Sequence, residues 1–208
     1  EVRVDSDRLE ADFGPYTPLE FVVSHPEGIK NPAVLQRIAE WQDAMEVDYQ
    51  VGWTRSISDV VQRLNSVLTG RSESIVPTDV RSIEQLLFLY EADADSDLPQ
   101  LMDSTETKTR VTVGAHMTSA QGFDETISRL TSLAEMPAGT TVQPAGYIPL
   151  YVRIMDHIVH SQMSSFATAF VVIFLLIGVL FRSVRIAIIA VPANLLPVLI
   201  TIGAMGYA

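Results

Sequence analysis

The sequence predicts an α+β domain followed by a pair of antiparallel transmembrane α-helices. Two uncharged runs near the C-terminus indicate the membrane part: 19 residues from Met163 to Phe181 and 23 from Ile186 to Ala208. A hydrocarbon core ~30 Å thick needs roughly 17–25 apolar helical residues, so each run is long enough to cross once. The residues before these runs alternate between strand-like and helix-like apolar spacing, which indicates the α+β domain.

Only residues 182–185 separate the two runs, so the two helices must be antiparallel neighbours. The charged residues of this turn are Arg182 and Arg185, and positive charge favours the cytoplasmic side. We therefore expect a multi-pass protein of the inner (plasma) membrane, with residues 1–160 outside the cytoplasm.

The net charge of −11 over 208 residues is unevenly distributed. From Ser161 onward there are two arginines and no acidic residue, so the first 160 residues carry a net charge of −13. This acidity argues against nucleic acid as a partner and against docking on anionic lipid. An extracytoplasmic domain needs an export signal, and none follows Glu1. We therefore expect the chain to be a piece of a longer protein with a transmembrane helix before Glu1.

The first part of the domain predicts strand–helix–strand. Residues 1–18 are polar and should lead out of the preceding membrane helix, and Leu19–Val23 alternates as a short strand. A helix should begin at Asn31-Pro32, because asparagine caps helices and proline suits the first helical position. The alternating Tyr49, Val51 and Trp53 predict the second strand.

Two inserted helices are predicted next, over about residues 56–105. The first opens with the capping-box pattern Ser56–Asp59 and ends at Gly70. The second is marked by apolar residues at helical spacing between Ile83 and Tyr90, and an acidic loop follows at residues 91–97.

The last part of the domain again predicts strand–helix–strand. Residues 110–117 alternate, with Val111, Val113, Ala115 and Met117 on one face. Residues 118–121 have capping-box form and open a helix, and residues 141–147 form the fourth strand. From Leu150 a helix is expected to run directly into the first membrane span, over residues 150–181.

This order of elements is the split βαβ, ferredoxin-like arrangement with a helical insertion. The extracytoplasmic domain is expected to cover residues 19–149. Its two crossovers should place both helices on the same face of a four-stranded sheet.

The membrane hairpin resembles a known family through Phe181-Arg182-Ser183-Val184-Arg185, residues 192–198 (PANLLPV) and residues 203–206 (GAMG). With the domain layout, these residues resemble the resistance–nodulation–division (RND) transporters. The similarity is to the MMPL and hydrophobe/amphiphile exporter branch, whose membrane core is related to the sterol-sensing domain. The chain is similar to the stretch from just after the first helix of one transporter half to the end of the third, and the proline pattern favours the C-terminal half.

The resemblance implies a porter domain in a proton-driven exporter of lipids or other amphiphiles. The implied partners are membrane lipid, a hydrophobic or amphiphilic substrate and the remainder of the same transporter chain, with a homo-oligomer left open. In this family the proton-coupling acids lie in the fourth helix of a half, whereas no Asp or Glu follows Asp156 here. The proton relay is therefore expected outside this chain.

Within the second span, Pro192, Asn194 and Pro197 are candidates for a hinge or for the lining of a substrate path. Each proline removes a backbone donor, and a polar residue in the bilayer favours an inward orientation; ordinary helix packing is the alternative. In the insertion, Phe88 and Leu89 lie beside the apolar stripe, which makes them the preferred substrate or partner surface.

Metal, cofactor and enzyme functions have little support in the sequence. Asp93, Asp95 and Asp97 resemble a calcium loop, but leucine and serine occupy the positions that need glycine and glutamate. His157 and His160 have ligand spacing on a helix but lack a third firm ligand. The chain has no cysteine, no Gly-x-Ser-x-Gly and no phosphate-cradling pattern, so we predict no enzyme and no cofactor.

A membrane-anchored extracytoplasmic sensor or assembly protein without transport activity is the alternative function. The short turn at residues 182–185 argues against it, because a receptor needs a signalling domain behind its span. The complete reading frame discriminates the two: about a dozen spans of ~20 residues each support a transporter, and two or three spans followed by a cytoplasmic domain support a sensor.

Overall fold

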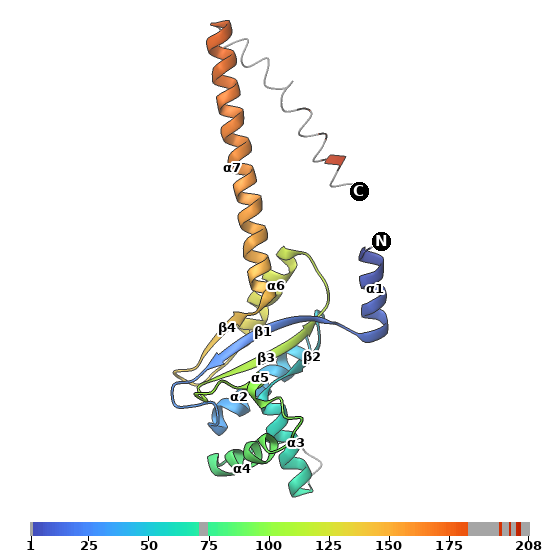
Figure 1. The fold of residues 1–208 in the computed structure, drawn as a ribbon, viewed down its shortest axis with the longest axis vertical. Coiled ribbons are helices and arrows are strands. Elements are labelled where there is room, and N and C mark those ends of the chain that lie inside the picture. Colours follow the sequence, from blue (N-terminus) through green and yellow to red (C-terminus); the bar gives the residue numbers. More distant parts are fainter. Residues whose placement is uncertain (1, 71–74, 183–195, 197–199, 201–202, 205–208) are drawn as a thin grey trace. The chain divides into compact units, whose positions relative to one another are not determined.

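A computed structural model describes residues 2–70, 75–182, 196, 200 and 203–204 (Figure 1). The chain divides into two compact units, Glu1–Arg153 and Ile154–Ala208. The elements are, in chain order, α1 (Val2–Phe13), β1 (Thr17–Ser24), α2 (Pro32–Glu46), β2 (Val51–Arg55), α3 (Ile57–Thr69), α4 (Val80–Glu91), α5 (Leu98–Leu101), β3 (Lys108–Ala115), α6 (Ala120–Ser132), β4 (Thr141–Ala145) and α7 (Tyr147–Phe181).

The first unit contains a four-stranded antiparallel sheet in the order β2-β3-β1-β4. Strand β1 is central and pairs with β3 along its whole length, from Thr17 opposite Ala115 to Ser24 opposite Lys108. The pairing of β2 with β3 is irregular beside Gly52, where the register shifts. The predicted α+β class and the long apolar helix are both confirmed.

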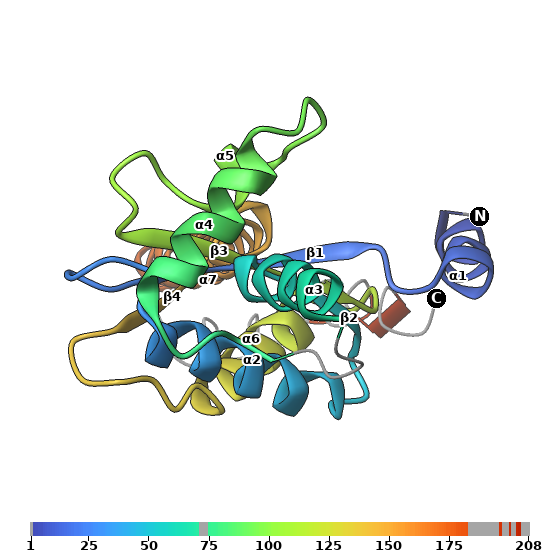
Figure 2. The same ribbon diagram turned by 90° about the horizontal axis from the view of Figure 1, so that it is seen from below.

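The core forms on one face of the sheet because β1 and β3 alternate. Leu19, Phe21 and Val23 of β1 are buried, as predicted from their spacing. Helix α2 covers them, and the Trp41 ring meets Phe21 edge to face at 5.3 Å between centroids. The Trp41 indole N–H donates to the Leu130 carbonyl oxygen of α6 at 2.8 Å, so α2 and α6 pack side by side (Figure 2).

The predicted helix ends are largely confirmed. The Asn31 side chain accepts from the Ala33 N–H at 2.9 Å and caps α2. Ser56 and Asp59 form the reciprocal capping box of α3, and Gly70 ends that helix with a left-handed φ of 65°. The cap of α6 differs: Ser119, not Thr118, accepts from the backbone N–H of the first turn.

Several predicted boundaries differ from those of the structure. The fourth strand ends at Ala145, and α7 begins at Tyr147 rather than Leu150, because Gly146 turns the chain with a φ of 82°. Met117 lies past the end of β3 and is 55% exposed, so it does not share the buried face. Residues 1–18 are more than a polar connection, since they include helix α1 and the start of β1.

Candidate functional site

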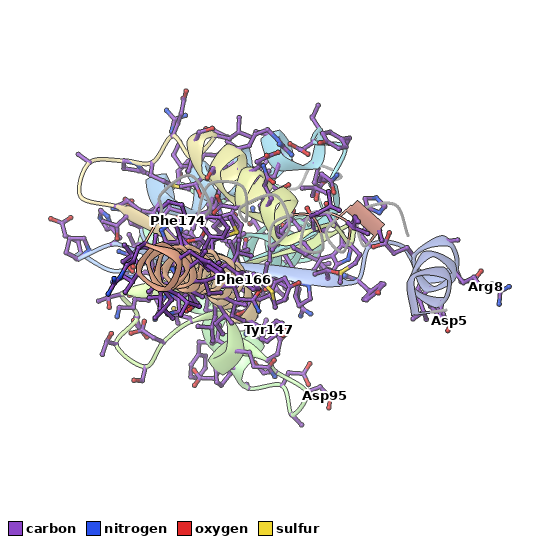
Figure 3. The ribbon with its side chains drawn as sticks, turned by 90° about the horizontal axis from the view of Figure 1, so that it is seen from above. Asp5, Arg8, Asp95, Tyr147, Phe166 and Phe174 are labelled. Carbon is purple, nitrogen blue, oxygen red and sulfur yellow. The ribbon has the colours of Figure 1, made fainter. Side chains whose placement is uncertain are left out.

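Helix α7 is 35 residues long; it begins in the first unit and continues into the second, of which it is the most apolar described feature. Among the described residues, it alone has the length and composition to cross a membrane. At 1.5 Å per residue it extends about 52 Å, longer than a hydrocarbon core of ~30 Å. Its uncharged part exposes large side chains, and Phe166 and Phe174 point outward from the helix axis (Figure 3). Exposed apolar surface of this extent marks an interaction site.

The first turn of α7 belongs to the α+β domain. Ile148 is 7% exposed and is part of the domain core, and the Tyr147 and Tyr151 rings stack at 6.2 Å. The helix then continues without interruption to Phe181, and Arg182 follows with a φ of 49°. The predicted helix over residues 150–181 is therefore confirmed as a single helix.

A groove of about 720 Å³ lies between α4, α5 and the loop that precedes β3. Leu87, Leu98 and Met102 give it apolar walls, and Phe88 stands at its edge with 75% of its surface exposed. The remaining lining residues are mostly charged: Lys30, Glu84, Glu91, Asp103 and Glu106, together with Pro99 and Ser104.

The charged end of the groove is built by contacts between distant parts of the chain. The Lys30 ammonium pairs with the Glu106 carboxylate at 2.6 Å, and the Ile29 N–H donates to the Glu106 carbonyl oxygen at 2.8 Å. Glu106 has a φ of 57°, a conformation that costs a non-glycine residue energy. The Asp103 carboxylate accepts from the Thr105 hydroxyl and from the Lys108 N–H, which lowers the pKa of Asp103.

Of the predicted surface pair, Phe88 lines the groove, whereas Leu89 is 51% exposed but is not among its lining residues. Sequence reasoning missed Glu84 and Glu91. A local signal for them exists, because Glu84, Phe88 and Glu91 are spaced at i, i+4 and i+7 and so share one face of a predicted helix. No local signal pointed to Lys30.

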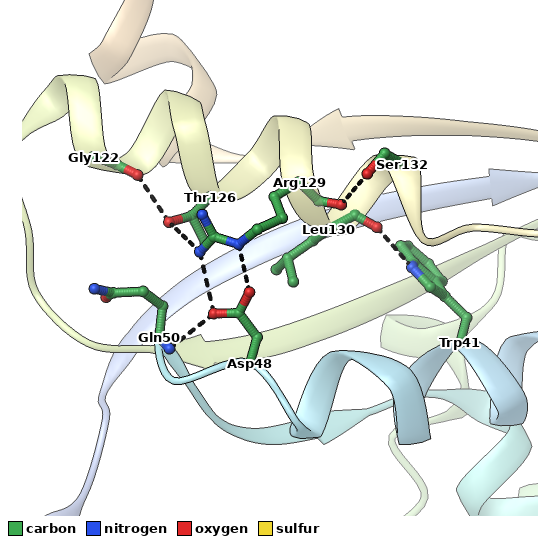
Figure 4. Close-up of polar contacts among 8 residues, drawn as sticks. All are labelled: Trp41, Asp48, Gln50, Gly122, Thr126, Arg129, Leu130 and Ser132. Atoms are coloured by element: carbon green, nitrogen blue, oxygen red, sulfur yellow. Dashed lines mark hydrogen bonds and ion pairs between the residues drawn. The ribbon is translucent and has the colours of Figure 1, made fainter.

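A second polar cluster joins the end of α2 to α6 (Figure 4). The Arg129 guanidinium binds both carboxylate oxygens of Asp48, with Nε–Oδ2 at 2.5 Å and Nη2–Oδ1 at 3.1 Å. Asp48 also accepts from the Gln50 N–H at 2.9 Å, and its side chain is only 8% exposed. The hydrogen bonds from Arg129 lower the pKa of Asp48, opposed by its burial. This cluster ties the α2–β2 connection to α6.

The aromatic residues of the domain differ in burial. Trp41 is buried in the core. Trp53 and Phe88 are not, with 40% and 75% of their surfaces exposed. The Trp53 side chain contacts the segment that precedes β1, and its indole N–H donates to the Pro15 carbonyl oxygen at 2.9 Å.

In the acidic loop after α4, the Asp97 carboxylate is bound by other side chains of the domain. Asp97 pairs with Arg55 at 2.5 Å and accepts from the Tyr90 hydroxyl, which raises the pKa of Tyr90. His157 and His160 are exposed on α7. Within residues 2–70 and 75–182, no three His, Cys, Asp or Glu side chains are grouped closely enough to hold a metal ion.

The other predicted site residues lie beyond the described part of the chain. They are Arg185 of the turn and Pro192, Asn194 and Pro197 of the second span, and most of the predicted span over residues 186–208 lies outside it as well. No protein-family model and no curated protein matches the chain.

Proposed function

We propose that this chain is part of a proton-driven RND-type exporter of lipids or other hydrophobic and amphiphilic molecules. One observation carries the proposal. Helix α7 leads from β4 of an acidic α+β domain, without interruption, into a 19-residue uncharged segment with exposed apolar side chains. One helix thereby connects a water-exposed domain to a segment suited to the bilayer.

The architecture of the domain supports a ferredoxin-like porter fold. All neighbouring strands are antiparallel in the order β4-β1-β3-β2, and α2 and α6 pack together on one face. The helices α3, α4 and α5 lie in the chain between β2 and β3, where the split βαβ scheme accepts an insertion.

The proposed topology places residues 1–160 outside the cytoplasm and Arg182 and Arg185 inside, with residues 186–208 as the second span. No acidic residue follows Asp156, so the proton-coupling groups belong to another part of the transporter. In this scheme the chain relays movement rather than coupling protons itself.

Helix α7 is the proposed relay. Its first turn contributes Ile148 to the domain core and directly follows β4. A hydrogen-bonded helix transmits displacement along its axis, whereas proline removes a backbone bond and kinks it. Interrupting α7 should therefore uncouple the domain from the membrane segment without unfolding either.

The test uses cells that carry the complete protein and follows efflux of Nile red, a hydrophobic fluorescent probe. Replacing Val159→Gly together with His160→Pro should abolish proton-dependent efflux, while the protein level in the membrane stays normal. The matched control, Val159→Ala with His160→Ala, keeps the helix and should export normally. Wild-type efflux by the Gly-Pro variant, or an absence of proton-dependent efflux from the wild type, would contradict the proposal.

A further inference from the structure

We propose that the groove between α4, α5 and the loop before β3 binds cationic amphiphiles. The ammonium head lies against Phe88 between Glu84 and Glu91, and the apolar tail lies along Leu87, Leu98 and Met102. That the bound amphiphile is also the exported substrate rests on the proposed export function. That the groove binds a cationic amphiphile does not depend on export.

The charge of the groove selects against anions. Among the described residues, one lysine and four carboxylates line it, which gives a formal charge of −3. The lysine, Lys30, is already paired with Glu106 at 2.6 Å. Among the described residues, the ion pairs include none made by Glu84 or Glu91, so these two carboxylates remain for a ligand.

The two carboxylates flank an exposed aromatic ring. Glu84, Phe88 and Glu91 lie four and three residues apart on α4, so one helix face presents carboxylate, ring and carboxylate in sequence. Quaternary ammonium groups bind to aromatic faces through the ring quadrupole, and nearby carboxylates add coulombic attraction. Phe88 keeps 75% of its surface exposed beside these two carboxylates, so its ring is open to the ligand head.

The remainder of the groove suits a short apolar chain. Its volume of about 720 Å³ is in the range of small-molecule sites. Leu87 and Leu98 are buried side chains of the domain core that form part of the walls, and Met102, a flexible thioether packed against that core, also lines the groove. The loop at residues 103–106 is fixed from two sides, by Lys30 and by the Ile29 N–H, so the groove is formed before a ligand arrives.

Methionine-methyl NMR gives a direct test on the complete chain in lipid nanodiscs. The chain has seven methionines. Of these, Met102 reports on the groove, Met45 on the buried core and Met163 on the apolar helix. The main probe is hexyltrimethylammonium, which has a cationic head and an apolar tail. Hexyl sulfate keeps the tail but reverses the charge of the head, and tetramethylammonium keeps the cationic head without the tail.

Hexyltrimethylammonium should shift the Met102 methyl resonance saturably, and the other two probes should bind at least about tenfold more weakly. Phe88→Ala should weaken binding by about tenfold, and Glu84→Gln with Glu91→Gln by about fivefold, with further weakening in high salt. The control pair Asp124→Asn and Glu135→Gln removes two exposed charges outside the groove and should leave binding unchanged.

Equal binding of hexyl sulfate, equal binding of tetramethylammonium, or an unaffected Phe88→Ala variant would each overturn the proposal, as would a shift confined to Met163. Saturable binding at Met102 in a protein that does not export Nile red would keep the site and remove the export function. The two proposals can therefore fail separately.

Discussion

Removing the guanidinium of Arg129 is expected to destabilise the α+β domain by about 2–3 kcal/mol. The substitution Arg129→Met keeps much of the side-chain volume but removes both hydrogen bonds to Asp48. The Asp48 side chain is 8% exposed and that of Arg129 is 37% exposed. The expected cost therefore lies between about 3–5 kcal/mol for breaking a buried pair and about 0–1 for an exposed one.

The pH dependence of this effect has a defined sign. The pKa of Asp48 is lower in the folded domain than in the unfolded chain, because Arg129 donates to its ionised form. Its contribution is present above the unfolded pKa of about 3.9 and is lost as the pH falls through the folded pKa. The stability difference between wild type and Arg129→Met should thus be full at neutral pH and shrink below about pH 4.

Thermal unfolding of the full chain in nanodiscs, followed by tryptophan fluorescence, measures the effect because Trp41 contacts Leu130 beside this pair. The midpoint should fall by about 4–12 °C for a domain of this size. The control Arg37→Met removes an exposed pair with Glu40 and should cost less than about 0.5 kcal/mol. If both variants lose the same small amount, the Asp48–Arg129 pair does not stabilise the domain as described.

Two further substitutions test the local geometry. Ser56→Ala removes the α3 cap and should cost about 1 kcal/mol by the same unfolding measurement, and no change would contradict the capping box. Gly114→Ala would place a Cβ 2.1 Å from the Trp53 indole nitrogen, so the indole must leave its position over the strand. Its fluorescence should then shift to longer wavelength with greater exposure to water, and an unshifted spectrum would contradict the close packing.

Features set by neighbouring residues were predictable from the sequence. The Asn31 and Ser56 caps, the end of α3 at Gly70 and the buried alternation of β1 each depend on residues a few positions apart. The start of α7 was misplaced because proline at position 149 and the strand-like alternation before it conceal the turn at Gly146. Local sequence patterns therefore predicted the presence of helices and strands more accurately than their first and last residues.

Contacts between distant residues could not be predicted in the same way. Lys30 and Glu106 are 76 residues apart, and Asp48 and Arg129 are 81 apart. Each pair depends on the fold bringing distant segments together: two loops for Lys30 and Glu106, and a loop and helix α6 for Asp48 and Arg129. Neither partner has a distinctive sequence context. Phe88 was identified as a surface residue, but the groove beside it depends on α5 and on the loop before β3, which no periodicity indicated.

The orientation of the chain in the membrane tests the central claim most directly. Because the chain has no cysteine, single cysteines report location without ambiguity. Asp95→Cys lies in the exposed loop after α4 (Figure 3). Ser183→Cys falls in the sequence between the two proposed spans. In right-side-out membrane vesicles, an impermeant maleimide should label Asp95→Cys at once and Ser183→Cys only after lysis. Labelling of Ser183→Cys in sealed vesicles, or protection of Asp95→Cys, would contradict the account.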